Sequence, residues 1–181
     1  GHPGMQDIGT LVITHLAARK LKIPVLAGGG FATGHGLVAA LALGAAGIVM
    51  GTRFMAVKES FIHDNVKNWM VQADETSTAV IQKNIGSPTR VALNSVAQEV
   101  MKLEEQGKGL EELLPLITGR RSTGVYNDGD VEAGIWSLGQ SVGLVEDIPT
   151  TKELIERMIA EAKESLEWLY QAIQVESETS R

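Results

Sequence analysis

Hydrophobic and polar positions follow two alternating patterns over the first sixty residues. Apolar residues recur at helical spacing over residues 10–22, and a short unbroken apolar run follows at residues 23–27. Residues 37–43 are rich in Ala and Leu and predict a second helix, and residues 47–51 form a second short apolar run. Such a run is typical of a strand buried on both faces. The order helix, strand, helix, strand therefore predicts a parallel α/β fold.

The pattern changes beyond residue 59, where residues 59–106 are predicted to be mixed and mainly helical. Ser87-Pro88-Thr89 predicts a turn there, and the polar, glycine-containing segment 119–130 predicts a loop. Further helices are predicted at residues 64–73, 95–105, 110–117 and 131–145, and from Thr150 or Thr151 to about residue 173.

Composition narrows the class of protein. The 181 residues are 44% hydrophobic and 21% charged, which is typical of a globular domain, and the net charge of -6 disfavours a nucleic-acid partner. No cysteine is present, which excludes disulfides, thiolate metal sites and a cysteine nucleophile. The four histidines show no metal-ligand spacing, so no metal site is expected. Without a leader pattern or a bilayer-length apolar segment, we expect a soluble, cytoplasmic protein with no membrane partner.

Small residues follow both predicted strands. Gly28, Gly29 and Gly30 come after the first strand, and Gly51 and Thr52 come after the second. Ligands of parallel α/β folds bind at these carboxyl ends, where bare amides can point at an anion. A helix starting just beyond the first glycines would add the positive end of its dipole. The two ends together predict a phosphate site, and plain tight turns are the alternative. Neither a P-loop nor a dinucleotide fingerprint is present.

His2 is the histidine whose position favours chemistry. It lies between glycines in a predicted loop just before a strand–helix unit, where the active sites of barrel enzymes are found. A histidine there can act as a general base or orient a substrate oxygen. The alternative is that it is a remnant of cloning.

Four segments stand in a particular order: GHPG at 1–4, IPVLAGGGF at 23–31, LGAAGIVMGTRF at 43–54 and GDVEAGIWSLGQSVGL at 129–144. Together they resemble the nitronate monooxygenase (2-nitropropane dioxygenase) family and its relatives, the flavin-dependent enoyl-ACP reductases. The resemblance implies the C-terminal portion of a (β/α)8 TIM barrel with an additional small helical domain. Residues 1–60 would be the last βα units, residues 61–120 a helical lid domain, and residues 121–181 a C-terminal loop and helices packing back on the barrel.

The same resemblance implies a cofactor, FMN, and a small-molecule substrate. Backbone amides of the strand-end glycines and the Thr52 hydroxyl would hold the FMN phosphate, and Gln140 and Ser141 would return to the flavin side of the pocket. His2 would be the base that takes a proton from a nitroalkane, in an enzyme that oxidises nitronates with molecular oxygen. Two alternatives stay open: an NAD(P)H-dependent flavin reductase such as an enoyl-ACP reductase, and a non-catalytic partial barrel that binds a phosphate ligand or a partner chain. The family's barrel has about six further strands, which an N-terminal barrel half or a homo-oligomer partner would supply.

Overall fold

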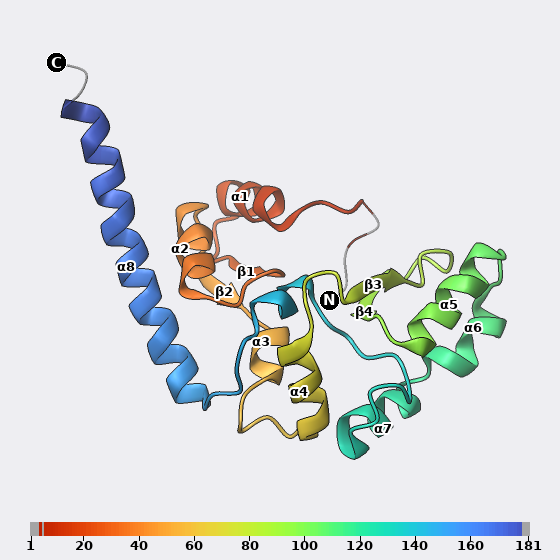
Figure 1. Cartoon of the computed structure of the whole chain (residues 1–181). Helices are drawn as coiled ribbons and strands as arrows, with labels where there is room; N and C mark the ends of the chain where they lie inside the picture. The colour runs from red at the N-terminus through yellow and green to blue at the C-terminus, as the bar shows by residue number, and fades with distance from the viewer. Residues whose placement is uncertain (1–3, 5, 179–181) are drawn as a thin grey trace.

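The computed structural model describes residue 4 and residues 6–178, with side chains described as far as residue 174. Helices and short strands alternate at the start, and helices dominate afterwards (Figure 1). The elements in chain order are α1 (Thr10–Lys20), β1 (Leu26–Gly28), α2 (Gly34–Ala42), β2 (Gly47–Val49), α3 (Thr52–Met55), α4 (Asp64–Gln72), β3 (Thr78–Ile81), β4 (Thr89–Ala92), α5 (Ser95–Glu105), α6 (Leu110–Ile117), α7 (Gly119–Asp128), the 3-10 helix η1 (Gln140–Leu144) and α8 (Thr151–Glu178).

The predicted parallel pair is confirmed. β1 and β2 pair in parallel, with Leu26 opposite Gly47 and Gly28 opposite Val49. Each strand has only three residues, fewer than the apolar run that predicts it, and β1 starts three residues later than expected. A small core of Ala27, Ala40 and Ala45 joins the pair to α2. These small side chains let the helix lie close to the strands, so the loops after β1 and β2 have a rigid base.

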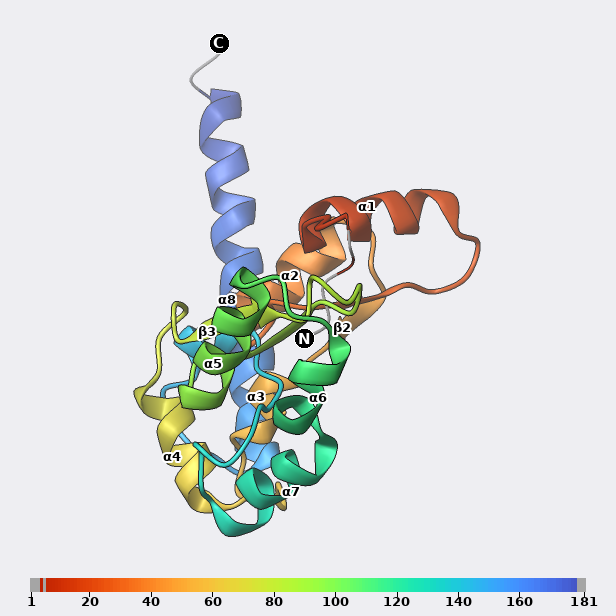
Figure 2. The same cartoon turned by 90° about the vertical axis from the view of Figure 1, so that its right-hand side faces the viewer.

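The last helix, α8, lies along α2 (Figure 1). Gly34 makes this approach possible, because a Cβ atom there would overlap the carbonyl oxygen of Met158 and lie 2.6 Å from the nitrogen of Ala162. Leu154 and Met158 pack on Val57 just beyond α3. The C-terminal half of α8 extends past the rest of the molecule in both views (Figures 1 and 2). Large apolar side chains are exposed along that half: Leu166, Trp168, Tyr170 and Ile173.

Residues 59–106 are predicted to be mixed and mainly helical. The structure adds an antiparallel hairpin to the helices of this segment. β3 and β4 pair from Thr78 opposite Ala92 to Ile81 opposite Thr89. The predicted turn at residues 87–89 therefore leads into β4 instead of joining two helices. β-branched residues make up much of both strands, which favours this structure, but four residues are too few for their pattern to exclude a helix. The hairpin, α5 and α6 share a core around Ile81, Val100 and Leu113.

Two predictions for residues 119–145 are wrong. Residues 119–128 form α7 instead of a loop, although they contain few strong helix formers. Contacts with the following segment stabilise this helix, because the Arg121 Nε donates to the Ala133 carbonyl at 2.7 Å and the Ser122 hydroxyl donates to that of Ile135. Gly129, with φ 74°, ends it.

The helix predicted at residues 131–145 is replaced by extended chain and the short η1. The amide of Ala92 donates to the carbonyl of Trp136 at 3.1 Å, and that of Leu138 donates to the carbonyl of Arg90 at 3.2 Å, so the segment runs along β4. Trp136 and Leu138, two positions apart, thereby reach the same face and join the main core. Three glycines, at positions 134, 139 and 143, also disfavour a helix here.

The chain leaves the α3 region and returns to it after some ninety residues. The amide of Lys58 donates to the carbonyl of Pro149 at 2.9 Å, which joins the two ends of the intervening segment 59–148. Within the described part of the chain, no helix has both the length and the apolar character needed to cross a bilayer.

Candidate functional site

Parallel pairing brings the strand-end glycines to one edge of the sheet. Because Gly28 lies opposite Val49, the residues after β1 and those after β2 begin at the same level. We call Gly28, Gly29, Gly30, Gly51 and Thr52 the glycine edge. Gly29 and Gly30 have φ of 99° and 88°, in the left-handed region that side chains disfavour. A Cβ atom at Gly30 or Gly51 would meet no atom within 4 Å. The backbone at Gly30 and Gly51 is therefore open to a ligand, as a phosphate site requires, whereas a Cβ atom at Gly29 would lie 3.2 Å from the Thr10 hydroxyl oxygen.

The C-terminal segment reaches the glycine edge through Thr52. The amide of Gly139 donates to the Thr52 hydroxyl at 2.9 Å, across 87 positions of sequence. This bond uses the hydroxyl as an acceptor, so its proton can still be donated to an anion. Ser141 is buried. It also lies near Thr52, because a Cβ atom built at Gly139 would be 3.1 Å from the Thr52 hydroxyl oxygen and 3.5 Å from the Ser141 hydroxyl oxygen. Gln140 is exposed. The structure thus brings Thr52 and Ser141 together.

The start of α2 is occupied by a side chain of the protein itself. The Gly34 amide donates to the Glu161 carboxylate at 2.7 Å, and the Gly36 amide donates to the Thr33 hydroxyl at 3.4 Å. A carboxylate here interacts favourably with the positive end of the helix dipole. The predicted contribution of this helix dipole to a phosphate site is therefore taken up, at the Gly34 amide, by the Glu161 carboxylate. The glycine edge itself remains the candidate anion site.

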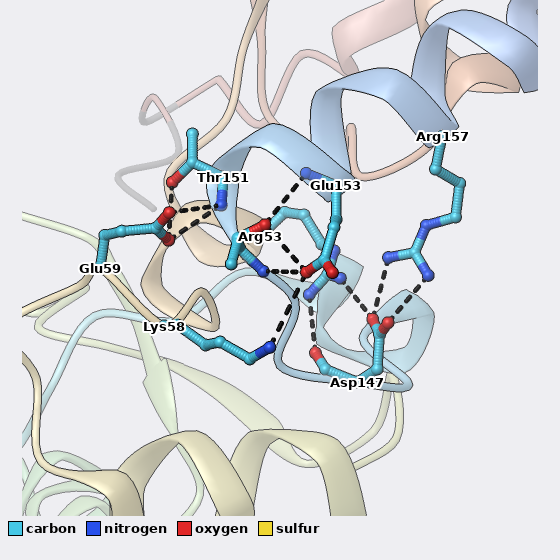
Figure 3. Close-up of polar contacts among 8 residues, drawn as sticks. Arg53, Lys58, Glu59, Asp147, Thr151, Glu153 and Arg157 are labelled. Carbon is cyan, nitrogen blue, oxygen red and sulfur yellow. Dashed lines mark hydrogen bonds and ion pairs between the residues drawn. The ribbon is translucent and has the colours of Figure 1, made fainter.

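A charged network that begins at Arg53, the residue after Thr52, was not predicted from the sequence (Figure 3). Arg53 is 2% exposed, and its guanidinium donates to the Asp147 carboxylate at 2.6 Å. Arg157 of α8 donates to both oxygens of the same carboxylate, at 2.8 and 2.9 Å. We call Arg53, Asp147 and Arg157 the Asp147 network. Hydrogen bonds from Arg157, together with the charges of both arginines, lower the pKa of Asp147, whereas burial lowers the pKa of Arg53 against the attraction of Asp147.

The N-terminus of α8 is held by two carboxylates (Figure 3). Glu153 accepts hydrogen bonds from the amide and hydroxyl of Thr150, and the Thr150 hydroxyl accepts one from the Glu153 amide. This reciprocal arrangement makes Thr150 the capping residue, one of the two positions, Thr150 and Thr151, at which the helix is predicted to start. Glu59 accepts from the amide of Thr151 at 2.8 Å, and this bond lowers the pKa of Glu59. Lys58 lies 3.8 Å from Glu153. These contacts fix the helix start beside α3.

His2, the candidate base, lies outside the described residues. Among the other histidines, His63 has a structural role, because its ring nitrogen accepts a hydrogen bond from the Asn65 amide at the start of α4. The His15 ring nitrogen lies 3.1 Å from the carbonyl oxygen of Leu43. Neither contact suggests a part in chemistry.

Comparison with known proteins identifies the family. The model of the nitronate monooxygenase family matches residues 1–161. A curated relative from Rhodococcus jostii, (3aS,4S,5R,7aS)-5-hydroxy-7a-methyl-1-oxo-octahydro-1H-indene-4-carboxyl-CoA dehydrogenase, is 32% identical over 90% of this chain and 56% of its own length. The chain thus spans about half the length of such relatives.

Two solved structures resemble the chain as a whole. FabK from Thermotoga maritima has a TM-score of 0.88 and 35% identity, over 95% of this chain and 54% of that one. The nitroalkane oxidase from Streptomyces ansochromogenes has a TM-score of 0.68 and 25% identity, over 90% of this chain and 46% of that one. The fold is accordingly α/β and corresponds to the C-terminal portion of a TIM barrel. With the family model matching most of its length, the chain belongs to the nitronate monooxygenase family.

Proposed function

We propose that the glycine edge binds the phosphate of FMN in a flavin-dependent oxidoreductase. The parallel pairing of β1 and β2 carries this proposal, because it sets Gly29 and Gly30 beside Gly51 and Thr52 at one open edge. Amides of the four residues and the Thr52 hydroxyl would donate to the phosphate oxygens. Gln140 and Ser141 lie on the segment that contacts Thr52 and would face the flavin side of the pocket. When bound, FMN would supply the redox chemistry.

Further strands are needed to close such a site. Two three-residue strands cannot form a barrel, and apolar residues of α1, β1 and β2 are exposed: Leu11, Val12, Ile13, Leu26 and Val49. Burying these side chains would contribute roughly 25 cal/mol for each Å² of apolar surface removed from water. We propose that an N-terminal barrel half, or a second copy of the chain, covers this surface. The relatives' greater length favours the barrel half.

The substrate that we propose is a nitronate or nitroalkane, oxidised with molecular oxygen. The family model and the similarity to a nitroalkane oxidase support this choice. His2 would take the acidic proton of a neutral nitroalkane. Replacing His2 by Ala in the active enzyme should then slow oxidation of the nitroalkane far more than oxidation of the pre-formed nitronate, which has already lost that proton. Equal slowing of both would remove the base role.

A second candidate is a flavin-dependent reductase or dehydrogenase of acyl thioesters, including NAD(P)H-dependent enoyl reductases. The observation that favours it is the Rhodococcus relative, which is named as a carboxyl-CoA dehydrogenase. The two functions predict different reactions. A nitronate enzyme consumes oxygen when nitronate is added and needs no nicotinamide, whereas a reductase of this class oxidises NAD(P)H when an enoyl thioester is added.

Flavin binding is tested first by the visible absorption spectrum of the purified chain, before and after FMN is added and free flavin removed. A retained band near about 450 nm, a general property of flavins, would support the proposed site. A chain that retains no flavin, alone or with the barrel half of a relative, would refute FMN binding and favour a non-catalytic phosphate-binding or partner-binding domain.

A further inference from the structure

Arg53 directly follows Thr52, and its guanidinium hydrogen-bonds to other parts of the protein. Its guanidinium donates to the carbonyls of Ala56 and Asp147, at 3.4 and 3.1 Å, and to the Asp147 carboxylate at 2.6 Å. All of these acceptors belong to the protein, and the side chain is buried. An arginine beside a phosphate loop suggests a phosphate ligand, but this one instead fixes the peptide next to Thr52.

Asp147 links this arginine to α8. Its carboxylate also accepts two hydrogen bonds from Arg157, a paired geometry that is stronger and more directional than a single contact. One helical turn further along α8, Glu161 holds the Gly34 amide, just after the other glycine loop. One helix is therefore linked to the chain just after each half of the glycine edge, directly at Gly34 and through Asp147 at Arg53. A cavity of about 160 Å³ lies among these groups, and its lining includes Thr33, Arg53, Asp147, Arg157 and Glu161.

The loop after β2, at Gly51 and Thr52, depends on contacts with distant residues for its shape. Glycine is the most flexible residue, and a Cβ atom built at Gly51 would meet no atom within 4 Å. Its geometry is therefore set through the residues that follow, by Thr52 bonded to Gly139 and by Arg53 bonded to Asp147. Donors that are fixed before binding lose less conformational entropy when the anion arrives.

We propose that Asp147 is a positioning residue for the phosphate end of the flavin site. Through Arg53 it holds the Gly51 amide and the Thr52 amide and hydroxyl in place for the phosphate. This inference rests on the proposed FMN site and adds to it a residue that touches neither the cofactor nor the substrate.

The test compares FMN with riboflavin, which has the same ring system but no phosphate. Dissociation constants of both are measured by flavin fluorescence titration for the wild-type chain and for Asp147→Asn, which keeps the shape of the side chain and removes its charge. Glu156→Gln is the matched control, because Glu156 is an exposed carboxylate of α8 whose ion pair, within the described residues, is with Lys152 at 3.8 Å. We expect Asp147→Asn to weaken FMN binding about tenfold and riboflavin binding less than about twofold, the size expected for a weakened charged hydrogen bond.

The outcomes separate this inference from the proposed function. Equal weakening of FMN and riboflavin, or no weakening of either, would show that Asp147 does not act on the phosphate end. If the wild-type chain binds neither flavin, the proposed function fails for this chain, and hydrogen exchange decides the positioning role. Asp147→Asn should then speed exchange of the Met55 amide, which donates to the Gly51 carbonyl, without changing exchange within α5. Unchanged exchange at Met55 would overturn the inference.

Discussion

Replacing Gly34 by Ala should separate α8 from α2. The new Cβ atom would overlap the carbonyl oxygen of Met158 and lie 2.6 Å from both the Ala162 nitrogen and the Glu161 Cβ. Two of these three atoms are backbone, so the clash cannot be relieved by turning a side chain. The helices must move apart, which also weakens the 2.7 Å hydrogen bond from the Gly34 amide to the Glu161 carboxylate.

The loss of stability can be estimated from the steric clash and the weakened hydrogen bond. Overpacking costs about 1–3 kcal/mol, and loss of a hydrogen bond to a charged group costs about 1.5–3 kcal/mol. The better helix propensity of Ala returns at most about 1 kcal/mol. We therefore expect Gly34→Ala to lower the free energy of unfolding by about 2–5 kcal/mol, measured by urea denaturation followed by circular dichroism. Glu161→Gln keeps the packing of the two helices, so it should lose at most the contribution of the charged hydrogen bond.

Gly119→Ala is the matched control, because Gly119 is also the first residue of a helix and a Cβ atom there meets nothing within 4 Å. Its effect should stay within about 0.5 kcal/mol of zero. If Gly34→Ala matched this control within about 1 kcal/mol, the close packing of α8 on α2 would be refuted.

Three further predictions concern the site. Gly30→Val should abolish FMN binding, because the side chain would fill the open space at the glycine edge; Gly86→Val, at a hairpin glycine with a similarly positive φ of 72° and equally open surroundings, should carry the same backbone strain and keep FMN affinity. Thr52→Val should weaken FMN binding by at least about tenfold, since it removes a donor to phosphate and leaves the Gly139 amide without its acceptor, whereas Thr52→Ser should retain binding. The pKa of Asp147 is lowered below its ordinary value of 3.8, so its contribution to stability is present above that value and is lost as the pH falls through the folded-state pKa. Acid denaturation curves should therefore be less steep for Asp147→Asn than for the wild type in that range, and identical curves would contradict the pairing with Arg53 and Arg157.

Local patterns predict several of the elements well. The βα alternation, α4, α5, α6 and the cap at Thr150 all follow from periodicity and turn residues, and the structure contains them. The glycines at the strand ends also show where a ligand can approach, because parallel strands end at one edge. The division into segments at residues 60 and 120 stays a prediction, as do the roles of His2 and Gln140.

Long-range contacts explain what the sequence did not reveal. α7 has a polar, glycine-containing sequence and is stabilised by its contacts with residues 133 and 135. The segment at Trp136 and Leu138 is extended because it pairs with β4. No local sequence pattern predicts this pairing. Arg53 and Asp147 are 94 positions apart, so only the folded chain shows them together. The one signal in the sequence was an arginine within an otherwise apolar, glycine-containing segment.

The hydrogen bond between Lys58 and Pro149 has a consequence for how proteins of this family can diversify. Because one hydrogen bond of 2.9 Å joins the two ends of segment 59–148, that segment is an excursion that starts and finishes at the same place. The parts of it that do not contact α3 or α8 can change while its two ends stay where they are. Gly139 and Asp147 must be kept, because they bind Thr52, Arg53 and Arg157. Natural variation can therefore act on the excursion while α3 and α8 keep their mutual position, and a laboratory graft that exchanges this excursion between relatives has a defined pair of splice points.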